Sequence, residues 1–325
     1  MTGRGTSGTV AEGAVRPPED VLKMKKGAGG VSTWIAVDWG TSNLRVWAMD
    51  GGRVAGEAQS GQGMASLSRE RFEPALLALA APWLVADQAV PVVVCGMAGA
   101  RQGWMEAPYR AVPCTPVDTA SLVSVPTADP RLSVRIVPGL KQSSPADVMR
   151  GEETQVAGAL ALIPGFDGVL CLPGTHSKWA HVSAGEVVSF QTCLTGEMFA
   201  LLSTASVLRH SMGGDGWDDA AFAEAVSDTL SRPERLAARL FGLRAESLIA
   251  GLGPAQARAR LSGLLIGAEL AATRPYWLGQ PVAIIGADRL ARAYASALGL
   301  QGLTTRLIPA TEATLRGLAT AGGLP

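Results

Sequence analysis

No pair of cysteines in this chain has the spacing of a zinc site or of a disulfide framework. The four cysteines, Cys95, Cys114, Cys171 and Cys193, are scattered without a CxxC motif, which favours a reducing, cytoplasmic setting. Neither sign of charge is in excess, because 28 Lys and Arg residues balance 28 Asp and Glu residues. Nucleic-acid binding, which normally needs a basic stripe, is therefore not expected.

Long apolar runs are also missing. The run PALLALAAPWLV at 74–85 is too short to span a membrane and contains proline, so no membrane contact is expected. Residues 1–30 lack the apolar segment of a secretory signal and are rich in Gly, Ser, Thr and charge, which predicts a disordered tail over 1–32. Whether this tail is native is left open. Hydrophobic residues still make up 47% of the 325 residues, enough for a sizeable core in one large domain or two ordinary ones.

An alternation of predicted strands and helices begins at Trp34. The first series has three short strands, a helix, two strands and a helix, at 34–40, 44–50, 53–60, about 68–86, 90–99, 133–140 and 151–163. The second series begins with three strands at 168–177, 178–185 and 186–194, followed by helical segments at about 196–212, 217–247 and 261–277. It ends with a strand at 282–288, a helix at 289–299, a strand at 304–309 and a helix at 311–322. We interpret this as βββαβαβα written twice, an α/β fold of two similar lobes with a ligand cleft between them.

The most informative motif is the hairpin VDWGTSNLRV at 37–46. An apolar strand ends in Asp38, and the turn that follows carries small hydrogen-bond donors at Gly40, Thr41 and Ser42. A carboxylate there can hold Mg²⁺, and the backbone N–H groups of the turn can wrap a phosphate, which indicates ATP chemistry. Taken alone, the motif fits an ordinary hairpin turn equally well.

A second hairpin strengthens this interpretation. The segment LPGTHSKWAHV at 172–182 has the same place in the second series that the first hairpin has in the first series. Its turn carries Gly174 and Thr175. Two such hairpins facing each other across a cleft would clamp a triphosphate from both sides. The pair therefore favours phosphate binding over two unrelated turns.

Several longer strings are together similar to the 2-dehydro-3-deoxygalactonokinase family, within the actin/hexokinase/heat-shock-70 ATPase superfamily. They are CGMAGARQGWMEAPYRAVP (95–113), VMRGEETQVAGA (148–159), LPGTHSKW (172–179), TCLTGE (192–197) and LSGLLIGAEL (261–270). The likeness runs from about residue 33 to the C-terminus. It implies a two-lobed ribonuclease H-like (actin-like ATPase) fold with a nucleotide cleft between lobes at 33–166 and 167–310, and a C-terminal helix, 311–325, that packs back on the first lobe.

The resemblance also implies a reaction, the MgATP-dependent phosphorylation of the 6-hydroxyl of 2-dehydro-3-deoxy-D-galactonate in galactonate breakdown. The two hairpins resemble the phosphate motifs of the superfamily, and IIGADRLARAYASALG at 284–299 resembles its adenosine motif. Further nucleotide contacts are then expected from His176, Lys178, Gly267 and Gly286. A kinase for another keto-deoxy sugar acid or a hexose is the alternative. An actin-like ATPase or regulatory module is the alternative outside metabolism, and a homodimer is left open.

Phosphoryl transfer is mostly positioning and charge neutralisation, but the attacking hydroxyl must lose a proton. In sugar kinases of this superfamily a carboxylate at the edge of the first lobe takes it, and the acidic pair in RGEETQ stands at the equivalent place. Glu152 is the first choice for the base, Glu153 the second and Asp38 the third. The alternative is that both glutamates only stabilise a helix N-terminus.

The substrate implied by the resemblance is an anion, and a planar guanidinium suits its carboxylate through two parallel hydrogen bonds. Arg150 adjoins the acidic pair, Arg45 follows the first hairpin, and Arg101 lies in another of the similar strings. The alternative for Arg45 and for Lys178 is to bind the transferred phosphate instead of the sugar acid. For each of them, an ordinary solvated surface charge is the alternative.

Overall fold

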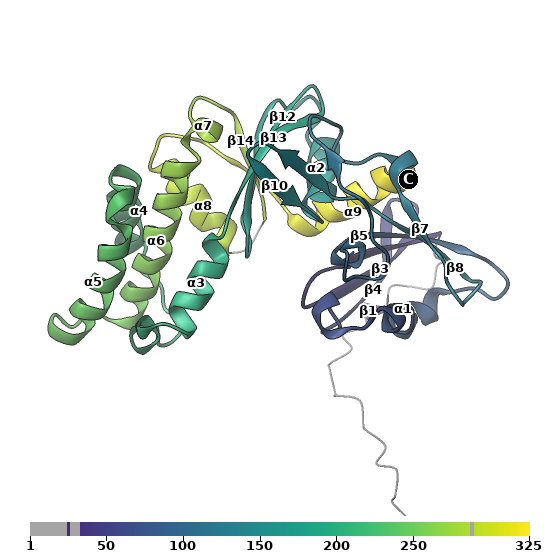
Figure 1. Ribbon diagram of the computed structural model, residues 1–325, viewed down its shortest axis with the longest axis horizontal. Helices are drawn as coiled ribbons and strands as arrows, with labels where there is room; N and C mark the ends of the chain where they lie inside the picture. Colours follow the sequence, from purple (N-terminus) through teal and green to yellow (C-terminus); the bar gives the residue numbers. More distant parts are fainter. Residues whose placement is uncertain (1–24, 27–32, 287–288) are drawn as a thin grey trace, which may run out of the picture.

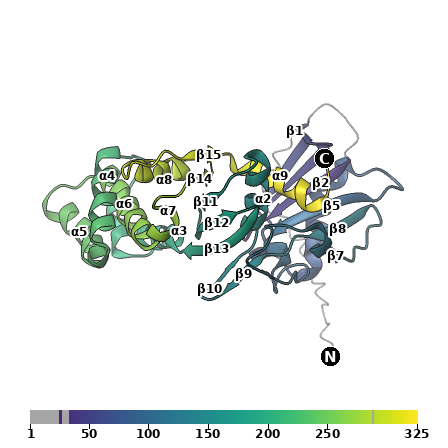
Figure 2. The same cartoon turned by 90° about the horizontal axis from the view of Figure 1, so that it is seen from above.

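The computed structural model describes residues 25–26, 33–286 and 289–325. In this part of the chain two mixed sheets stand apart, with two helices between them and a cluster of helices beyond the second sheet (Figures 1 and 2). The predicted disordered tail over 1–32 lies outside the described residues except at Lys25–Lys26. These two residues form strand β1, which pairs with β4 (Arg53–Ser60) at the edge of the first sheet.

The first sheet has the strand order β1-β4-β3-β2-β5-β8-β7. Its further strands are β2 (Trp34–Trp39), β3 (Leu44–Asp50), β5 (Val90–Gly96), β7 (Val123–Val125) and β8 (Leu132–Ile136). Strand β3 pairs antiparallel with both β2 and β4, whereas β5 and β8 run parallel to β2. Both faces of β2 are buried, because α1 (Phe72–Ala80) covers one face and α9 (Ala310–Gly322) covers the other. This explains why the strand has apolar residues on both faces.

The second sheet repeats the inner five strands of the first. Its order is β13-β12-β11-β14-β15. Strand β12 pairs antiparallel with β11 and β13, whereas β14 and β15 run parallel to β11. The strands are β11 (Gly168–Leu172), β12 (Ser177–Ser183), β13 (Glu186–Cys193), β14 (Val282–Ile285) and β15 (Arg306–Ile308). This shared order makes the protein a two-lobed ribonuclease H-like fold, as the sequence predicted.

The repeat is less regular than βββαβαβα written twice. In the second lobe, α8 (Arg289–Gly299) connects the last two strands of the sheet. In the first lobe, the connecting segment 97–131 has only 3-10 turns and the short strands β6 (Arg110–Ala111) and β7. The helix predicted over 68–86 is also shorter, because 3-10 turns flank α1 on both sides.

A hairpin that the sequence analysis did not predict joins the two lobes. Strands β9 (Leu140–Ser143) and β10 (Ala146–Met149) form a three-stranded sheet with β6. The Gln142 amide oxygen accepts a hydrogen bond from Phe190 N at 3.0 Å, and the Asp147 carboxylate accepts one from Thr192 N at 2.7 Å. Side chains of the hairpin thereby bind the outer edge of β13, where the backbone of Cys114 also pairs with Val187.

The cluster of helices beyond the second sheet is inserted between β13 and β14. It contains α3 (Thr195–Thr204), α4 (Asp219–Ser231), α5 (Leu236–Ile249), α6 (Pro254–Ala272) and α7 (Arg274–Trp277). α6 starts well before the helix predicted at 261–277, and a separate short helix completes that stretch. None of the described helices is both long and apolar enough to cross a membrane.

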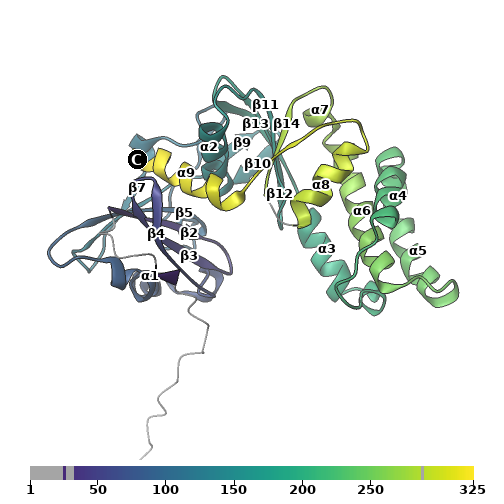
Figure 3. The same ribbon diagram turned by 180° about the vertical axis from the view of Figure 1, so that it is seen from behind.

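Two helices lie between the sheets, α2 (Glu152–Leu162) and α9 (Figure 3). They cross at backbone contact, because a Cβ added at Gly158 would lie 1.7 Å from the carbonyl oxygen of Ala313. A Cβ added at Gly317 would lie 1.8 Å from the carbonyl oxygen of Thr154. Only glycine permits this approach. The lobe boundaries expected at 166/167 and 310/311 stay predictions, but α9 packs against α2, β2 and β5.

Replacing Gly317 by alanine is expected to destabilise the fold by about 1–3 kcal/mol or more, because the added methyl group overlaps the α2 backbone. The control is Gly242→Ala in α5, where the nearest atom to an added Cβ is a glutamate oxygen 3.9 Å away. That change is expected to stabilise the protein by roughly 0.5–1 kcal/mol through helix propensity alone. Urea unfolding measures both variants, and equal stability for the two would contradict the glycine crossing.

Candidate active site

The first hairpin presents its turn to solvent. Thr41 and Ser42 are exposed, and Gly40 N closes the turn by donating to Asn43 O at 2.9 Å. The following segment supports the tip from behind, since a Cβ added at Gly63 would lie 2.3 Å from the Thr41 carbonyl oxygen. The turn is thus held in shape while its hydroxyl groups stay open to a ligand.

A cavity of about 680 Å³ joins the two hairpins. Its lining includes the turn of the first hairpin and one residue of the second: Asp38, Gly40, Thr41, Ser42, Asn43, Arg45, Gln59, Ser60, Gly61 and Thr175. The structure therefore brings the turn of the first hairpin and Thr175 of the second to one polar space, whereas Gly174, His176 and Lys178 are outside its lining.

Asp38 and Arg45 face this cavity as a pair. They are direct cross-strand partners in β2 and β3, and Arg45 Nη2 donates to the Asp38 carboxylate. Arg45 was expected among the substrate arginines, with the phosphate as its alternative. The structure places it beside Asp38 in the lining of the polar cavity.

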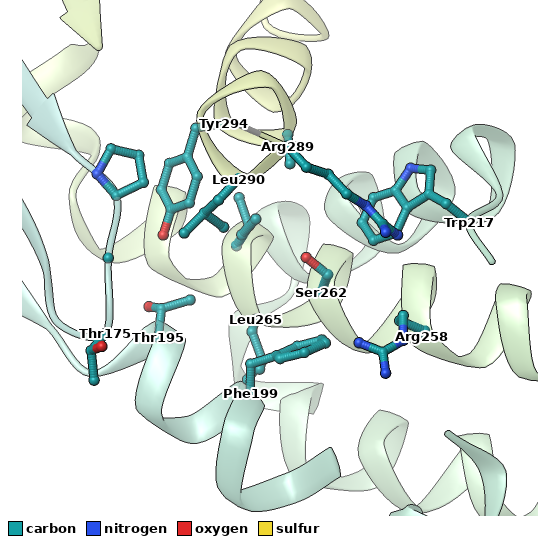
Figure 4. A pocket seen from close by; sticks show the side chains of 15 residues that line it. Thr175, Thr195, Phe199, Trp217, Arg258, Ser262, Leu265, Arg289, Leu290 and Tyr294 are labelled. Atoms are coloured by element: carbon teal, nitrogen blue, oxygen red, sulfur yellow. The ribbon is translucent and has the colours of Figure 1, made fainter. Parts of the chain in front are cut away.

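A second cavity of about 540 Å³ adjoins the first at a shared lining residue, and Figure 4 shows this second cavity. Thr175 lines both cavities, and Gly174 lines the second. Apolar side chains cover much of its wall: Phe199, Leu265, Ile266, Leu290 and Ala293. A long ligand with an apolar ring at one end and an anionic chain at the other would fit the two cavities together.

Two arginines close the far end of the second cavity. The Arg289 guanidinium lies 4.4 Å from the ring centre of Trp217, and the Arg258 guanidinium lies 5.7 Å from that of Phe199. Figure 4 shows these groups opposite Thr175, across the hydroxyl of Ser262. Planar guanidinium and aromatic groups suit the face of a nucleotide base.

Two glycines expected at the nucleotide lie behind the cavity wall. A Cβ added at Gly267 would lie 2.4 Å from Thr229 Oγ1, so this glycine permits the close packing of α6 on α4. Gly267 is outside the cavity lining, and its expected nucleotide contact stays a prediction. Gly286 directly follows β14, and its N–H donates to Ile308 O at 2.7 Å. It is outside the cavity lining, whereas the helix that follows contributes several lining residues.

His176 and Lys178 flank the second hairpin differently. His176 is exposed, and its Nε2 lies 2.5 Å from Glu197 Oε2 at the start of α3. Lys178 is buried, and its Nζ lies 3.5 Å from Glu152 Oε1. Because Lys178 is on β12 and Glu152 begins α2, this ion pair joins the second lobe to the start of a helix that lies between the lobes.

The N-terminus of α2 lies next to Asp38. A Cβ added at Gly96 would be 3.5 Å from Asp38 Oδ1, and one added at Gly151 would be 3.4 Å from the Gly96 Cα. Gly96 thus separates the carboxylate of the first hairpin from the start of the helix. Glu152, the first residue of α2, keeps 26% of its side chain exposed there.

Glu153 is placed differently from its neighbour. It is fully buried, and its carboxyl oxygens accept hydrogen bonds from Gly151 N at 2.7 Å and Thr154 Oγ1 at 3.0 Å. Burial raises the pKa of Glu153 to about 8, and the nearby charge of Glu152 contributes to the rise. The prediction of Glu153 as second choice for the base is corrected, because its side chain has no exposed surface for a substrate hydroxyl to reach.

The structure does not bring the three predicted substrate arginines together. Arg150 points into the protein, where Nη2 donates to Ala107 O at 2.8 Å and the guanidinium stacks 4.3 Å from the ring centre of Tyr109. Its Nε and Nη1 are buried without a partner among the described residues. Arg150 therefore clamps the segment after β5, and Arg101 lies exposed on that segment.

The comparison with known proteins identifies the family of the chain. The model of the family described as 2-keto-3-deoxy-galactonokinase matches residues 38–321. The chain belongs to this family. It is 39% identical over 300 residues to a protein of Rhizobium meliloti (strain 1021) that carries the provisional name 2-dehydro-3-deoxygalactonokinase DgoK1, covering 89% of this chain and 96% of the relative. It is 34% identical to the 2-dehydro-3-deoxygalactonokinase of Escherichia coli (strain K12), covering 88% and 96%.

A solved structure extends the similarity to the fold. The crystal structure of a candidate 2-dehydro-3-deoxygalactonokinase from Sinorhizobium meliloti has a TM-score of 0.81 and 38% identity, with 89% of this chain and 97% of that chain covered. The resemblance of the sequence strings to the family is thereby confirmed over most of the chain.

Two parts of the candidate site were not predicted from the sequence. One is the part of the second cavity's wall formed by Phe199, Trp217 and Arg258, which lie outside every motif named in the sequence, whereas Arg289 lies in the string that resembles the adenosine motif. The other is Glu269, a buried carboxylate that accepts hydrogen bonds from Trp179 Nε1 and Tyr294 OH, both at 2.7 Å. A single acidic residue in the apolar string LSGLLIGAEL was a signal that could have found it.

The raised pKa of Glu153 predicts a pH-dependent contribution to stability. The unfolded state loses this proton near 4.5, the ordinary pKa of a glutamate, whereas the folded state keeps it up to about pH 8. The contribution is therefore complete below pH 4.5 and is lost as pH rises through 8, on the order of 4 kcal/mol in all. Thermal unfolding between pH 5 and 8 is expected to show Glu153→Gln gaining stability relative to the unchanged protein as pH rises.

The exposed Glu312 at the start of α9 provides the control. Glu312→Gln removes the same charge and shows how much of the change comes from net charge alone. A constant difference between Glu153→Gln and the unchanged protein over this pH range would contradict a protonated Glu153.

Proposed function

We propose that the protein transfers the γ-phosphoryl group of ATP to the 6-hydroxyl of 2-dehydro-3-deoxy-D-galactonate. The observation that carries this proposal is the place of Thr175, which lines both the apolar and the polar cavity. One nucleotide can then lie with its base against the apolar wall and its phosphates between the two hairpins. The named relatives of the family supply the identity of the acceptor.

The residues at the polar cavity suit Mg²⁺ bound together with the triphosphate. The described residues contain no group of three or more His, Cys, Asp or Glu side chains that could enclose a metal ion. Mg²⁺ commonly takes one or two carboxylates and completes its shell with phosphate oxygens and water. Asp38 would be that carboxylate, and the ion would neutralise charge on the β- and γ-phosphates.

Glu152 is our choice for the general base. In the reaction, the 6-hydroxyl oxygen forms a bond to the γ-phosphorus, the bond from that phosphorus to the β,γ-bridging oxygen breaks, and ADP leaves. The hydroxyl proton passes to the base. Glu152 is partly exposed beside Asp38, whereas Glu153 is buried, and Asp38 is paired with Arg45 at the phosphate cavity.

The arginines divide between the two substrates. Arg45 lines the phosphate cavity, and we assign it to the phosphates together with Gly40, Thr41 and Ser42. Arg101 and Arg150 belong to the acceptor side, because Arg150 adjoins Glu152 and holds the segment that carries Arg101. The carboxylate of the sugar acid would then bind away from the triphosphate, which keeps two anions apart.

The carboxylate roles predict different kinetic losses. Glu152→Gln is expected to lower kcat by about 10²- to 10⁴-fold, the usual contribution of a general base, with the KM for ATP within about twofold. Asp38→Asn is expected to raise the KM for MgATP as well, because it removes the proposed metal ligand. An assay that couples ADP release to NADH oxidation measures both, with Glu153→Gln as control. Loss of kcat in Glu153→Gln but not in Glu152→Gln would reverse the assignment.

The acceptor is tested with a panel of sugar acids. The same assay with 2-dehydro-3-deoxy-D-galactonate, its C4 epimer and glucose is expected to give the highest kcat/KM for the first, with a phosphate on its 6-hydroxyl by mass spectrometry and NMR. Equal turnover of glucose would overturn the substrate assignment. ATP hydrolysis without a phosphorylated product would point instead to an ATPase module.

A further inference from the structure

One buried carboxylate lies behind the wall of the apolar cavity without lining it. Glu269, on α6, is 4% exposed. Its Oε2 accepts hydrogen bonds from Ser177 Oγ at 2.9 Å and Tyr294 OH at 2.7 Å, and its Oε1 accepts one from Trp179 Nε1 at 2.7 Å. The Thr195 side chain also hydrogen-bonds to it. Four side chains from three other elements therefore converge on one carboxyl group.

These four partners belong to the elements that form the proposed nucleotide site. Ser177 begins β12, two residues after Thr175 in the turn of the second hairpin. Thr195 is the first residue of α3 and lines the apolar cavity. Tyr294, on α8, lines the same cavity (Figure 4). Glu269 thus connects the phosphate turn to two walls of the base cavity through single hydrogen bonds.

The chemistry of the partners requires an acceptor at this position. An indole N–H can only donate, and the hydroxyls of Ser177 and Tyr294 both have a carboxylate oxygen within reach. Burial raises the pKa of the Glu269 carboxyl, while the four hydrogen bonds favour its ionised form. No Lys or Arg forms an ion pair with Glu269 among the described residues. The burial of this carboxyl group without a cation is therefore compensated by the four hydrogen-bond donors.

We propose that Glu269 is a positioning residue for ATP, which fixes the second hairpin and the α3 and α8 walls of the base cavity relative to one another. The proposal rests on the proposed function, because that function places ATP in these cavities. The nearly isosteric substitution Glu269→Gln would leave one acceptor oxygen and introduce one NH₂ group. The oxygen can serve Trp179, but the NH₂ would then face Ser177 and Tyr294, whose hydroxyls would have to turn around.

The test is direct nucleotide binding to Glu269→Gln, measured by isothermal titration calorimetry with Mg²⁺ and the non-hydrolysable analogue AMP-PNP. We expect Kd to rise about tenfold or more, with a similar rise in the KM for ATP. The KM for the sugar acid should stay within about twofold. A residue that only stabilised the lobe would not separate the two substrates in this way.

Thr229 provides the matched control. It is fully buried in the same bundle, and its Oγ1 donates to Leu264 O at 2.7 Å, away from Glu269. Thr229→Val removes a buried hydrogen bond of the second lobe and is expected to lower stability while leaving Kd for AMP-PNP unchanged. Equal weakening by Thr229→Val and Glu269→Gln would overturn the proposal.

Tyr294→Phe keeps the inference testable if Glu269→Gln fails to fold. It removes one of the four donors, leaves the carboxylate in place, and is expected to raise Kd about two- to fivefold. A Kd for AMP-PNP equal to that of the unchanged protein in Glu269→Gln would overturn this inference but not the proposed function. If only Tyr294→Phe folds, an unchanged Kd in that variant has the same meaning. Absence of AMP-PNP binding to the unchanged protein would overturn the proposed function as well. Binding without phosphorylation of the sugar acid would overturn only the proposed acceptor.

Discussion

The arrangement of the two lobes depends on the backbone crossing of α2 and α9. Gly158 and Gly317 let each helix approach the carbonyl groups of the other, and no larger residue fits at either place. α9 packs on the first sheet and α2 on the second, so the crossing sets the distance between the sheets. Because α2 begins at Glu152, the same contact determines how far the proposed base stands from Asp38. The packing of two helices therefore sets the geometry of a site at their edge.

Two smaller contacts between the lobes complete this arrangement. Lys178 reaches from the second sheet to Glu152, and the β9–β10 hairpin binds the outer edge of β13 through Gln142 and Asp147. The hairpin leads directly into Arg150, which clamps the segment after β5. The proposed acceptor side of the cleft is thus built on connections that cross between lobes, whereas the proposed phosphate side is built on two local hairpins.

This difference explains what the sequence could predict. The hairpins at Asp38 and Thr175 are local, because strand patterns and turn residues specify them within about ten positions, and their meeting followed from the repeated strand order. Glu152 and Glu153 could not be separated, since the exposure of each depends on how α2 packs. The inward direction of Arg150 and the helix contact of Gly267 were likewise set by distant segments. The β9–β10 hairpin was missed because its short strands are largely polar and lack a clear alternation.

The charges of the site follow a single rule, that each exposed carboxylate has its own cation. Asp38 has Arg45 and Glu152 has Lys178, while Glu153, whose pKa is raised to about 8, is held neutral at pH 7 by burial. Two unpaired carboxylates at this place would repel an incoming triphosphate. Paired ones leave the cleft near neutrality, and Arg45 lines the cavity to which we assign the phosphates. A neutral Glu153 behind them adds no negative charge to the cleft while still accepting the N–H group at the start of α2. The environment of each carboxyl group, more than its position in the sequence, therefore separates the proposed metal ligand, the proposed base and the structural residue.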